Sequence, residues 1–451
     1  MKINIPLLVM LSAVSCSGLT SYNSQIDPAY ASYRSGDTAA AAEAALGLAT
    51  EHDGENDSLV FTLEAGSMLR DAARYEESTI ELNAAEYFIK EDFDLRATLD
   101  PKDMLETIGA YGVSSKVLTY KGYVADRIMI NTMKALNYIA IGDIEGAATE
   151  TRRLVSAQED GEKMYAEDSD LTRQSSDEGM SGKEATIDVL GFGQDFVDET
   201  GKPFRELFSG LYIDTRMDGF KFPFSTFVSG LVGRLAPEVG GDPQYDFDAL
   251  AASNPKNSVI ADEKAAIDNG DSADGWAYVI FENGVAPRKV SVEMPIPVGY
   301  MRALFSPDSN LGDYFSVSYM ALPSLTRGKL AAEDGLFLEG ANGLALITEV
   351  ISDMSQVMAY EYQQTWPSML RREITAFIIK TIAIEMGSDY VEGEVDNPLG
   401  DSEYAQEAGS WFTSLMKSST SKSLSQADDR NWRSLARQYE IGRFNLEGQS
   451  S

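Results

Sequence analysis

The stretch "YIAIGDIEGAATETRRL", residues 138–154, decides the fold, because it has the pattern of two helices joined by a tight turn. Gly142 and Asp143 form the turn, and the apolar side chains that follow it return at helical spacing. They define one stripe, made of Ile144, Ala147, Ala148, Thr151, Leu154 and Val155. A matching stripe precedes the turn, so we expect an antiparallel helical hairpin in which Ala147 packs near Ile139.

The same pattern occurs twice nearer the N-terminus. "YRSGDTAAAAEAA" (33–45) and "LRDAARYEESTIEL" (69–82) each have helix-forming residues on both sides of a short turn. If Gly36, Ala73 and Gly142 are equivalent turn positions, their separations are close to one and two units of a period of about 34 residues. That period is typical of tetratricopeptide repeats.

We expect these helical repeats to occupy residues 27–156, and a further helical repeat region to occupy residues 188–270. Residues 157–187, between the two regions, are rich in Glu, Asp, Ser, Gln and Gly and poor in large apolar side chains. A segment of this composition cannot bury enough apolar surface to order itself. The sequence therefore predicts a flexible acidic loop over residues 157–187.

From Trp276 onward the apolar period changes from the helical value to two, which is the period of a β-strand. We expect strands over residues 276–284, 289–298 and 314–324, paired in a small antiparallel sheet. Two prolines on the outward phase of the second strand cannot donate to a ladder, so this should be an edge strand.

Helices are expected again over residues 344–358, 372–386 and 402–418, and the end of the chain is a candidate for one more strand. Together with the sheet, they predict an α+β C-terminal domain over residues 271–447. The expected fold is mainly α with a small antiparallel β portion. It is a tetratricopeptide-like helical-hairpin solenoid followed by the α+β domain.

The first residues have the pattern of a bacterial lipoprotein signal peptide. An apolar run too short to span a bilayer precedes small residues and then Cys16, the single cysteine of the chain. We expect residues 1–15 to be removed, Cys16 to carry the lipid and residues 16–26 to form a lipid-anchored tether. Ser17 stands where an inner-membrane retention signal would have Asp. We therefore expect attachment to the outer membrane of a Gram-negative cell, on the periplasmic side.

The composition limits the partners that the chain can bind. Its formal net charge is -34, from 71 acidic and 37 basic residues, and such a field repels phosphate backbones. We expect no nucleic-acid partner. With Cys16 acylated, no thiol is left for a disulfide, a nucleophile or a thiolate metal site, and the sequence indicates no cofactor.

Few residues suggest catalysis. The single histidine, His52, lies in "EHDGEND" (51–57), where we expect a solvated surface residue rather than a catalyst or a metal ligand. One histidine without a free cysteine excludes Ser-His-Asp, Cys-His and His/Cys zinc systems. The acidic segments 268–275 and 389–401 offer oxygen ligands for calcium, but with Gly270 or Gly275 at the turn position the first segment lacks the ligand spacing of a hand-type loop, so we expect solvated loops. A pair of carboxylates that acts on a glycan stays open, because its spacing is a three-dimensional property.

Arg152 and Arg153 are the candidate partner-binding residues. Because they are adjacent on a helix, their side chains point about 100° apart and cannot both share the apolar stripe. In a chain this acidic, both charges can simply neutralise nearby carboxylates. Alternatively, one of them lines the concave face of the solenoid and binds a carboxylate of a partner in the bidentate geometry that a guanidinium favours.

Four segments carry a resemblance to a known family: "ALNYIAIGDIEGAATETRRL", "FENGVAPRK", "RREITAFIIKTIA" and "ADDRNWRSLARQYEIGRF". They resemble functionally uncharacterised bacterial lipoproteins with tetratricopeptide-like repeats, and the resemblance covers most of the chain. Members of that family are often encoded near a lipoprotein activator of a penicillin-binding protein. The resemblance thus implies a role near peptidoglycan synthesis, and it supplies no catalytic residues.

We therefore expect an outer-membrane-anchored lipoprotein that acts as a non-enzymatic scaffold for a cell-envelope protein. One alternative is an envelope enzyme that uses carboxylates on a glycan. Another is an oligomeric outer-membrane assembly or secretion factor. Clustered buried carboxylates with raised pKa values would favour the enzyme, whereas an exposed apolar patch would favour the scaffold.

Overall fold

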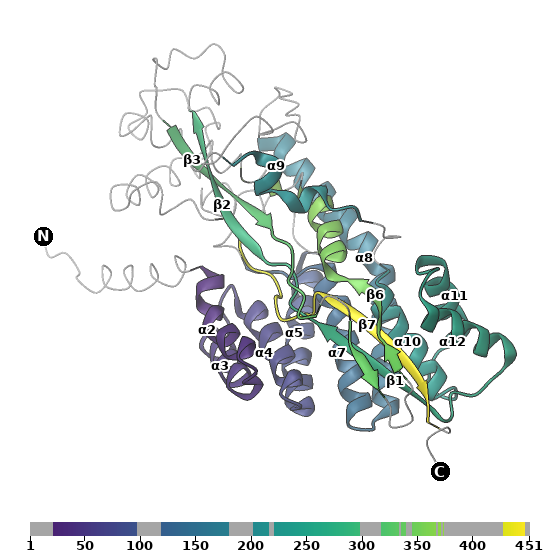
Figure 1. Cartoon of the computed structure of the whole chain (residues 1–451). Helices are drawn as coiled ribbons and strands as arrows, with labels where there is room; N and C mark the ends of the chain where they lie inside the picture. The colour runs from purple at the N-terminus through teal and green to yellow at the C-terminus, as the bar shows by residue number, and fades with distance from the viewer. Residues whose placement is uncertain are drawn as a thin grey trace, which may run out of the picture.

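The protein is mainly helical, with small antiparallel sheets (Figure 1). The computed structural model describes residues 21–96, 119–179, 202–215, 221–297, 317–332, 335–339, 345–366, 369–370, 373 and 427–446. The signal peptide, Cys16 and the expected helices over 372–386 and 402–418 lie outside these ranges, apart from Glu373. Within the described ranges, none of the helices has both the length and the apolarity that crossing a bilayer requires.

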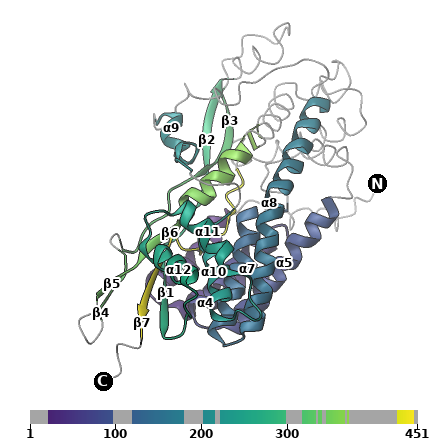
Figure 2. The same ribbon diagram turned by 90° about the vertical axis from the view of Figure 1, so that its right-hand side faces the viewer.

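The first half of the chain forms a series of helices, most of which are joined to the next one by a short turn. Their bounds are α2 (Tyr22–Arg34), α3 (Thr38–Glu51), α4 (Ser58–Asp71), α5 (Tyr75–Arg96), α7 (Val124–Ala140) and α8 (Ile144–Gly179). Each helix packs against the next one in this series, and Figure 2 shows α5, α7 and α8 side by side.

The three predicted turns share one backbone geometry. Gly36, Ala73 and Gly142 have positive φ angles of 83°, 57° and 80°. In each turn this residue donates its backbone N–H to the carbonyl three positions back, and the next residue donates to the carbonyl five positions back. A left-handed residue with such hydrogen bonds ends a helix and reverses the chain. The predicted turn positions are confirmed.

Small residues let the helices approach closely at the turn between α7 and α8. Ala147 is fully buried in a cluster that includes Val232, and Tyr138 and Ile139 pack against this cluster. A Cβ atom added to Gly146 would lie 2.7 Å from Cδ1 of Tyr138. The predicted position of Ala147 near Ile139 is confirmed.

Two expected boundaries are wrong. The flexible loop expected over 157–187 is helical as far as Gly179, because α8 continues to that residue. Glu, Gln and Lys rarely lie in a core but are good helix formers, so composition alone did not exclude a helix. At the N-terminus, α2 begins at Tyr22, within the expected tether 16–26, and buries Tyr22 and Ile26 completely.

Shorter helices follow within the region 188–270, as expected. They are α9 (Phe204–Leu207), the 3-10 helix η3 (Ser209–Tyr212), α10 (Pro223–Leu235), α11 (Pro243–Ser253) and α12 (Ser258–Asn269). Asp242 and Asn257 cap α11 and α12, since their side chains accept from backbone N–H groups of the first turn. α10 packs against α7, α8 and α11, so this region continues the helical layer.

The described strands form antiparallel sheets. In one sheet, β1 (Trp276–Asn283), β7 (Gln438–Asn445) and β6 (Glu349–Asp353) pair in the order β1-β7-β6. β2 (Lys289–Pro297) pairs with β3 (Val317–Leu325), and β4 (Phe337–Glu339) pairs with β5 (Ala345–Ile347). β7, yellow in Figure 1, is therefore the central strand of its sheet.

The expected strands are present, but their pairing differs from the prediction. The sequence places 276–284 and 289–298 in one sheet, whereas β1 pairs with β7 and β2 pairs with β3. The segment 344–358, expected as one helix, instead forms β5, β6 and the start of a helix over 354–366. An apolar pattern over so few residues is compatible with a helix or with a strand. The positions i, i+3 and i+4 of a helical stripe include residues that would lie on both faces of a strand.

The helices differ in how many of their sides are buried. α4 is buried at every position from Ser58 to Leu69, because α3 and α5 cover two sides and the C-terminal part of the chain covers a third. We call residues 427–437, which lead into β7, the closing segment. We call the surface of α2 and α4 that this segment covers the inner face; it carries Asn23, Asp27, Tyr30, Glu64 and Ser67.

Candidate functional site

Buried charged side chains gather where the closing segment meets α2 and α4. Glu64 of α4 is fully buried and accepts hydrogen bonds from the hydroxyls of Tyr22 and Tyr30. It also accepts from the backbone N–H of Arg433 at 2.7 Å. Burial, followed by the negative charge of Glu64, raises the pKa of both tyrosines well above 10.0, so both hydroxyls stay protonated donors.

The aromatic and basic side chains of the closing segment add to this attachment. Nε1 of Trp432 donates to Oγ of Ser67 at 2.8 Å, and the indole is fully buried. The guanidinium of Arg433 lies 4.3 Å from the ring centre of Tyr30 and bonds to Asp27 at 3.2 Å. Cation–π contacts and ion pairs of this kind favour one register of the segment on the inner face.

A second group of carboxylates lies at the N-terminal end of α7. Both oxygens of Glu361, from the helix over 354–366, accept backbone N–H groups of that first turn, from Val124 at 2.8 Å and from Ala125 at 3.1 Å. Oδ2 of Asp126 accepts from the hydroxyl of Tyr120 at 2.7 Å and from the backbone N–H of Tyr123 at 2.9 Å. These carboxylates satisfy the N–H groups that a helix leaves free at its start.

The pKa values of these carboxyls reflect their burial. Burial raises the pKa of Glu361 to about 8, and the neighbouring charge of Asp126 adds to the effect. Burial raises the pKa of Asp126 to about 6. Nζ of Lys289 bonds to the hydroxyl of Tyr123 nearby and brings a positive charge towards both carboxyls.

The closing segment supplies its own ion pair beside this group. Nε of Arg430 lies 2.8 Å from Oδ1 of Asp428, and Arg430 is almost completely buried. Burial alone would raise the pKa of Asp428, but the charges of Arg430 and Lys289 hold it well below its usual range. Nη1 of Arg430 also donates to the backbone carbonyl of Asn56, at 3.2 Å. The pair thus connects the closing segment to the loop before α4.

This arrangement is suited to holding elements together. Glu64, Asp126 and Glu361 all receive hydrogen bonds from the chain itself, mostly from backbone N–H groups and tyrosines. A substrate could reach these oxygens only by displacing donors that close a helix end or fix the closing segment. Raised pKa values can mark active sites, but buried structural networks raise them too.

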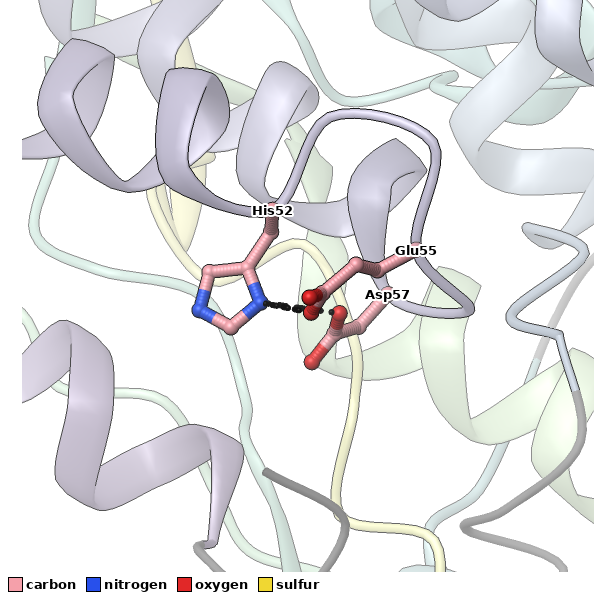
Figure 3. A group of neighbouring side chains, drawn as sticks. All are labelled: His52, Glu55 and Asp57. Atoms are coloured by element: carbon pink, nitrogen blue, oxygen red, sulfur yellow. Dashed lines mark hydrogen bonds and ion pairs between the residues drawn. The ribbon is translucent and has the colours of Figure 1, made fainter. Parts of the chain in front are cut away.

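A distinct cluster lies in the loop between α3 and α4 (Figure 3). Nδ1 of His52 is 2.8 Å from Oε2 of Glu55 and 3.2 Å from Oδ1 of Asp57. The imidazole stacks on the ring of Phe61, with the ring centres 4.4 Å apart. The side chain of His52 is 8% exposed, whereas that of Glu55 is 47% exposed, so the cluster is open on one side.

The expectation of a solvated His52 is therefore wrong. His52 ends α3, and Phe61, on the first turns of α4, shields one side of its ring. A polar loop sequence suggests exposure, but a loop between two packed helices lies close to both of them. The sequence could have indicated the cluster through the short spacing of His52, Glu55 and Asp57 within one tight loop.

The two arginines expected to bind a partner have partners within the chain. Arg152 donates to the backbone carbonyl of Val239 at 3.1 Å. Arg153 forms an ion pair with Glu150 at 2.9 Å and lies 3.7 Å from Glu86, and its side chain is 51% exposed. Their side chains diverge, as expected for neighbours on a helix.

The remaining sequence candidates fall into two classes. Cys16 and the acidic segment 389–401 lie outside the described residues. In the segment 268–275, Asp268 pairs with Lys264 at 2.5 Å, and Gly270 ends α12 with a φ of 75°. The segment therefore begins with the last residues of α12 and the C-cap of this helix.

Sequence reasoning missed Glu64, Asp126, Lys289 and Glu361, because charged residues within helical or strand patterns are usually assigned to the solvent side. One signal was present for Asp126, which lies three residues after Tyr123 at the start of α7, where an acidic side chain can accept the backbone N–H of the N-cap residue. Comparison with protein-family models, curated proteins and solved structures finds no match, so no family membership follows for this chain.

Proposed function

We propose that this chain is a lipid-anchored lipoprotein of the outer membrane that acts as a non-enzymatic scaffold for a protein of the cell envelope. The observation that carries the proposal is that the buried carboxylates serve the fold: they accept hydrogen bonds from backbone N–H groups, tyrosines and the closing segment. The family resemblance favours a role near peptidoglycan synthesis.

The helix pairs are proposed to form a solenoid of the tetratricopeptide type. The shared geometry of the turns at Gly36, Ala73 and Gly142 supports this, as does the packing of each helix on the next. The closing segment already occupies the inner face of α2 and α4. We therefore place the partner on an outer helix rather than on that face.

The outer side of α5 is the best candidate surface. Ile80 and Tyr87 are 64% and 61% exposed, and their separation of two helical turns places them on the same side of α5. Arg153 of α8 borders this side, because its guanidinium lies 3.7 Å from Glu86. Exposed aromatic and aliphatic anchors beside an arginine are typical of protein interfaces.

Crosslinking in the native cell, followed by copurification, tests this surface. We expect Tyr87→Ser to lose the crosslinked partner without a change in melting temperature, because the side chain is mainly exposed. Tyr245→Ser is the matched control, since Tyr245 is 71% exposed on α11, in another part of the molecule. If both variants capture the same partner as the unchanged chain, the surface of α5 is not the binding site.

The anchor is tested separately. Cys16→Ser removes the only thiol that can be acylated, so we expect the protein to be unprocessed or released from the membrane fraction. A variant that still fractionates with the outer membrane, and is cut at the same place, would contradict the lipoprotein proposal while leaving the partner surface open to test.

A further inference from the structure

The cluster in the α3–α4 loop places three candidate metal ligands around one point. Nδ1 of His52, a carboxylate oxygen of Glu55 and one of Asp57 all lie within 4.8 Å of one another. All three come from a six-residue stretch, 52–57, that is fixed at both ends by helices. Figure 3 shows both carboxylates turned towards the same ring nitrogen.

Two carboxylate oxygens share one ring nitrogen in this cluster, although the exposed side of Glu55 can also accept from water. A neutral imidazole has at most one proton on Nδ1, yet oxygens of Glu55 and Asp57 lie at 2.8 Å and 3.2 Å from that atom. Among the described residues, neither carboxylate has another hydrogen-bond donor. One proton cannot serve both oxygens well, whereas a cation between the three atoms would satisfy them together.

Asp57 also departs from the behaviour of similar residues in this chain. It occupies the N-cap position of α4 but makes no side-chain bond to that helix. Asp37 and Asp242, at the same position of α3 and α11, each accept a backbone N–H at 3.0 Å. Ser58, which follows Asp57, is buried and its hydroxyl has no hydrogen-bond partner among the described residues. The side chains of Asp57 and Ser58 therefore do not cap the start of α4.

We propose that His52, Glu55 and Asp57 bind a divalent first-row transition metal of the zinc class. One imidazole nitrogen with two carboxylate oxygens suits such ions, whereas calcium and magnesium favour all-oxygen sites. Ligand atoms about 2.0–2.1 Å from a tetrahedral zinc ion lie roughly 3.3 Å apart. The distances from Nδ1 to the oxygens of Glu55 and Asp57, 2.8 Å and 3.2 Å, are close to this separation. The exposed side of Glu55 leaves room for a water ligand. Arg430 interacts with Asp57 and reduces the negative charge of the site.

The single histidine makes the test direct. The mature chain is purified without a histidine tag and titrated with zinc, while the imidazole nitrogen resonances of His52 are followed by NMR. We expect a saturable change centred on Nδ1, together with a melting temperature that rises with zinc concentration. Calcium in the same excess should produce neither change.

Variants separate the site from the many other carboxylates of the chain. His52→Asn keeps an N–H donor near the position of Nδ1 but lacks a metal-binding nitrogen, and we expect it to weaken zinc binding at least about tenfold. Glu55→Gln and Asp57→Asn should each weaken it as well. Glu51→Gln, at the exposed end of α3, is the matched control and should bind like the unchanged chain. Equal zinc affinity in His52→Asn and the unchanged chain, or no change at the His52 resonances in excess zinc, would overturn the proposal.

Discussion

The helices α3 and α4 are neighbours of equal length, yet they bury different amounts of surface. α3 buries one stripe completely, made of Ala41, Ala42, Ala45 and Ala49, and leaves its other residues exposed or only partly buried. α4 buries every residue from Ser58 to Leu69, including Glu64. The difference arises because the closing segment covers α4 and does not cover α3. An amphipathic helix needs one packing surface, whereas α4 needs the closing segment to complete its surroundings.

The comparison teaches where polar groups can be buried. On α3, side chains that are not apolar face water and need no partner from the protein. On α4, the same kind of residue must find a donor or an acceptor, because an unpaired buried polar group is costly. Tyr30, Trp432 and Arg433 supply such groups.

The largest effect is expected where the closing segment is anchored. Trp432→Ala removes a fully buried indole and its bonds to Ser67 and Ser434, so we expect the free energy of unfolding to fall by about 3–5 kcal/mol. Chemical denaturation measures it. Tyr87→Ala, on the exposed side of α5, should change stability by only about 0.5 kcal/mol or less. If Trp432→Ala and Tyr87→Ala lower the free energy of unfolding by similar amounts, the closing segment does not stabilise the fold more than the exposed side of α5 does.

A smaller effect is expected at the start of α7, where Glu361 titrates. Its pKa is about 8 in the folded protein and 4.5 ordinarily, so between these pH values the folded state binds more protons than the unfolded state. Its contribution to stability is therefore complete below about pH 4.5 and is lost as the pH rises towards 8, at up to about 1.4 kcal/mol per pH unit.

Glu361→Gln cannot titrate, so the fall in melting temperature between pH 5 and pH 8 should be shallower in this variant than in the unchanged chain. Asp126, with a pKa of about 6, acts in the same direction at lower pH and should remain active in the variant. Parallel melting curves across this range would show that Glu361 does not titrate there.

The smallest effect is expected at the turn that joins α4 to α5. Ala73 has a φ of 57°, a region that glycine adopts more readily, so Ala73→Gly should stabilise the protein by about 0.5–1 kcal/mol. Gly142→Ala is the matched reverse change. A Cβ atom at Gly142 meets no other atom within 4 Å, so its cost of about 1 kcal/mol comes from the backbone alone. Thermal unfolding of both variants measures these effects. If the two substitutions change the stability in the same direction, the turns are not equivalent.

Local features of the fold could be predicted from the sequence. The hairpin around Gly142 and the strand over 276–284 follow from apolar periods, which report on the few residues that surround each position. The pairing of β1 with β7 could not be predicted in this way. Residues such as Glu282 and Tyr439 face each other although 157 positions separate them, and no period in either segment identifies the other.

The candidate sites were harder to predict for a related reason. Glu64 is buried because Tyr22, Tyr30 and Arg433 converge on it from distant parts of the chain, and each of these residues alone is ordinary. His52 was visible as the single histidine, but its burial depends on Phe61 and on the packing of two helices. Periodicity assigns such residues to water, and only their assembled neighbours show otherwise.

The central position of β7 has a consequence for how the protein is made. β1 and β6 each pair with β7 and not with each other, and both precede β7 in the chain, so they are synthesised before their shared neighbour. A chain that stops after β6 would leave both strands without this partner and α4 without its cover. Synthesis as far as β7 is then a condition for this sheet to form, and products that end before β7 would present apolar surface to proteases.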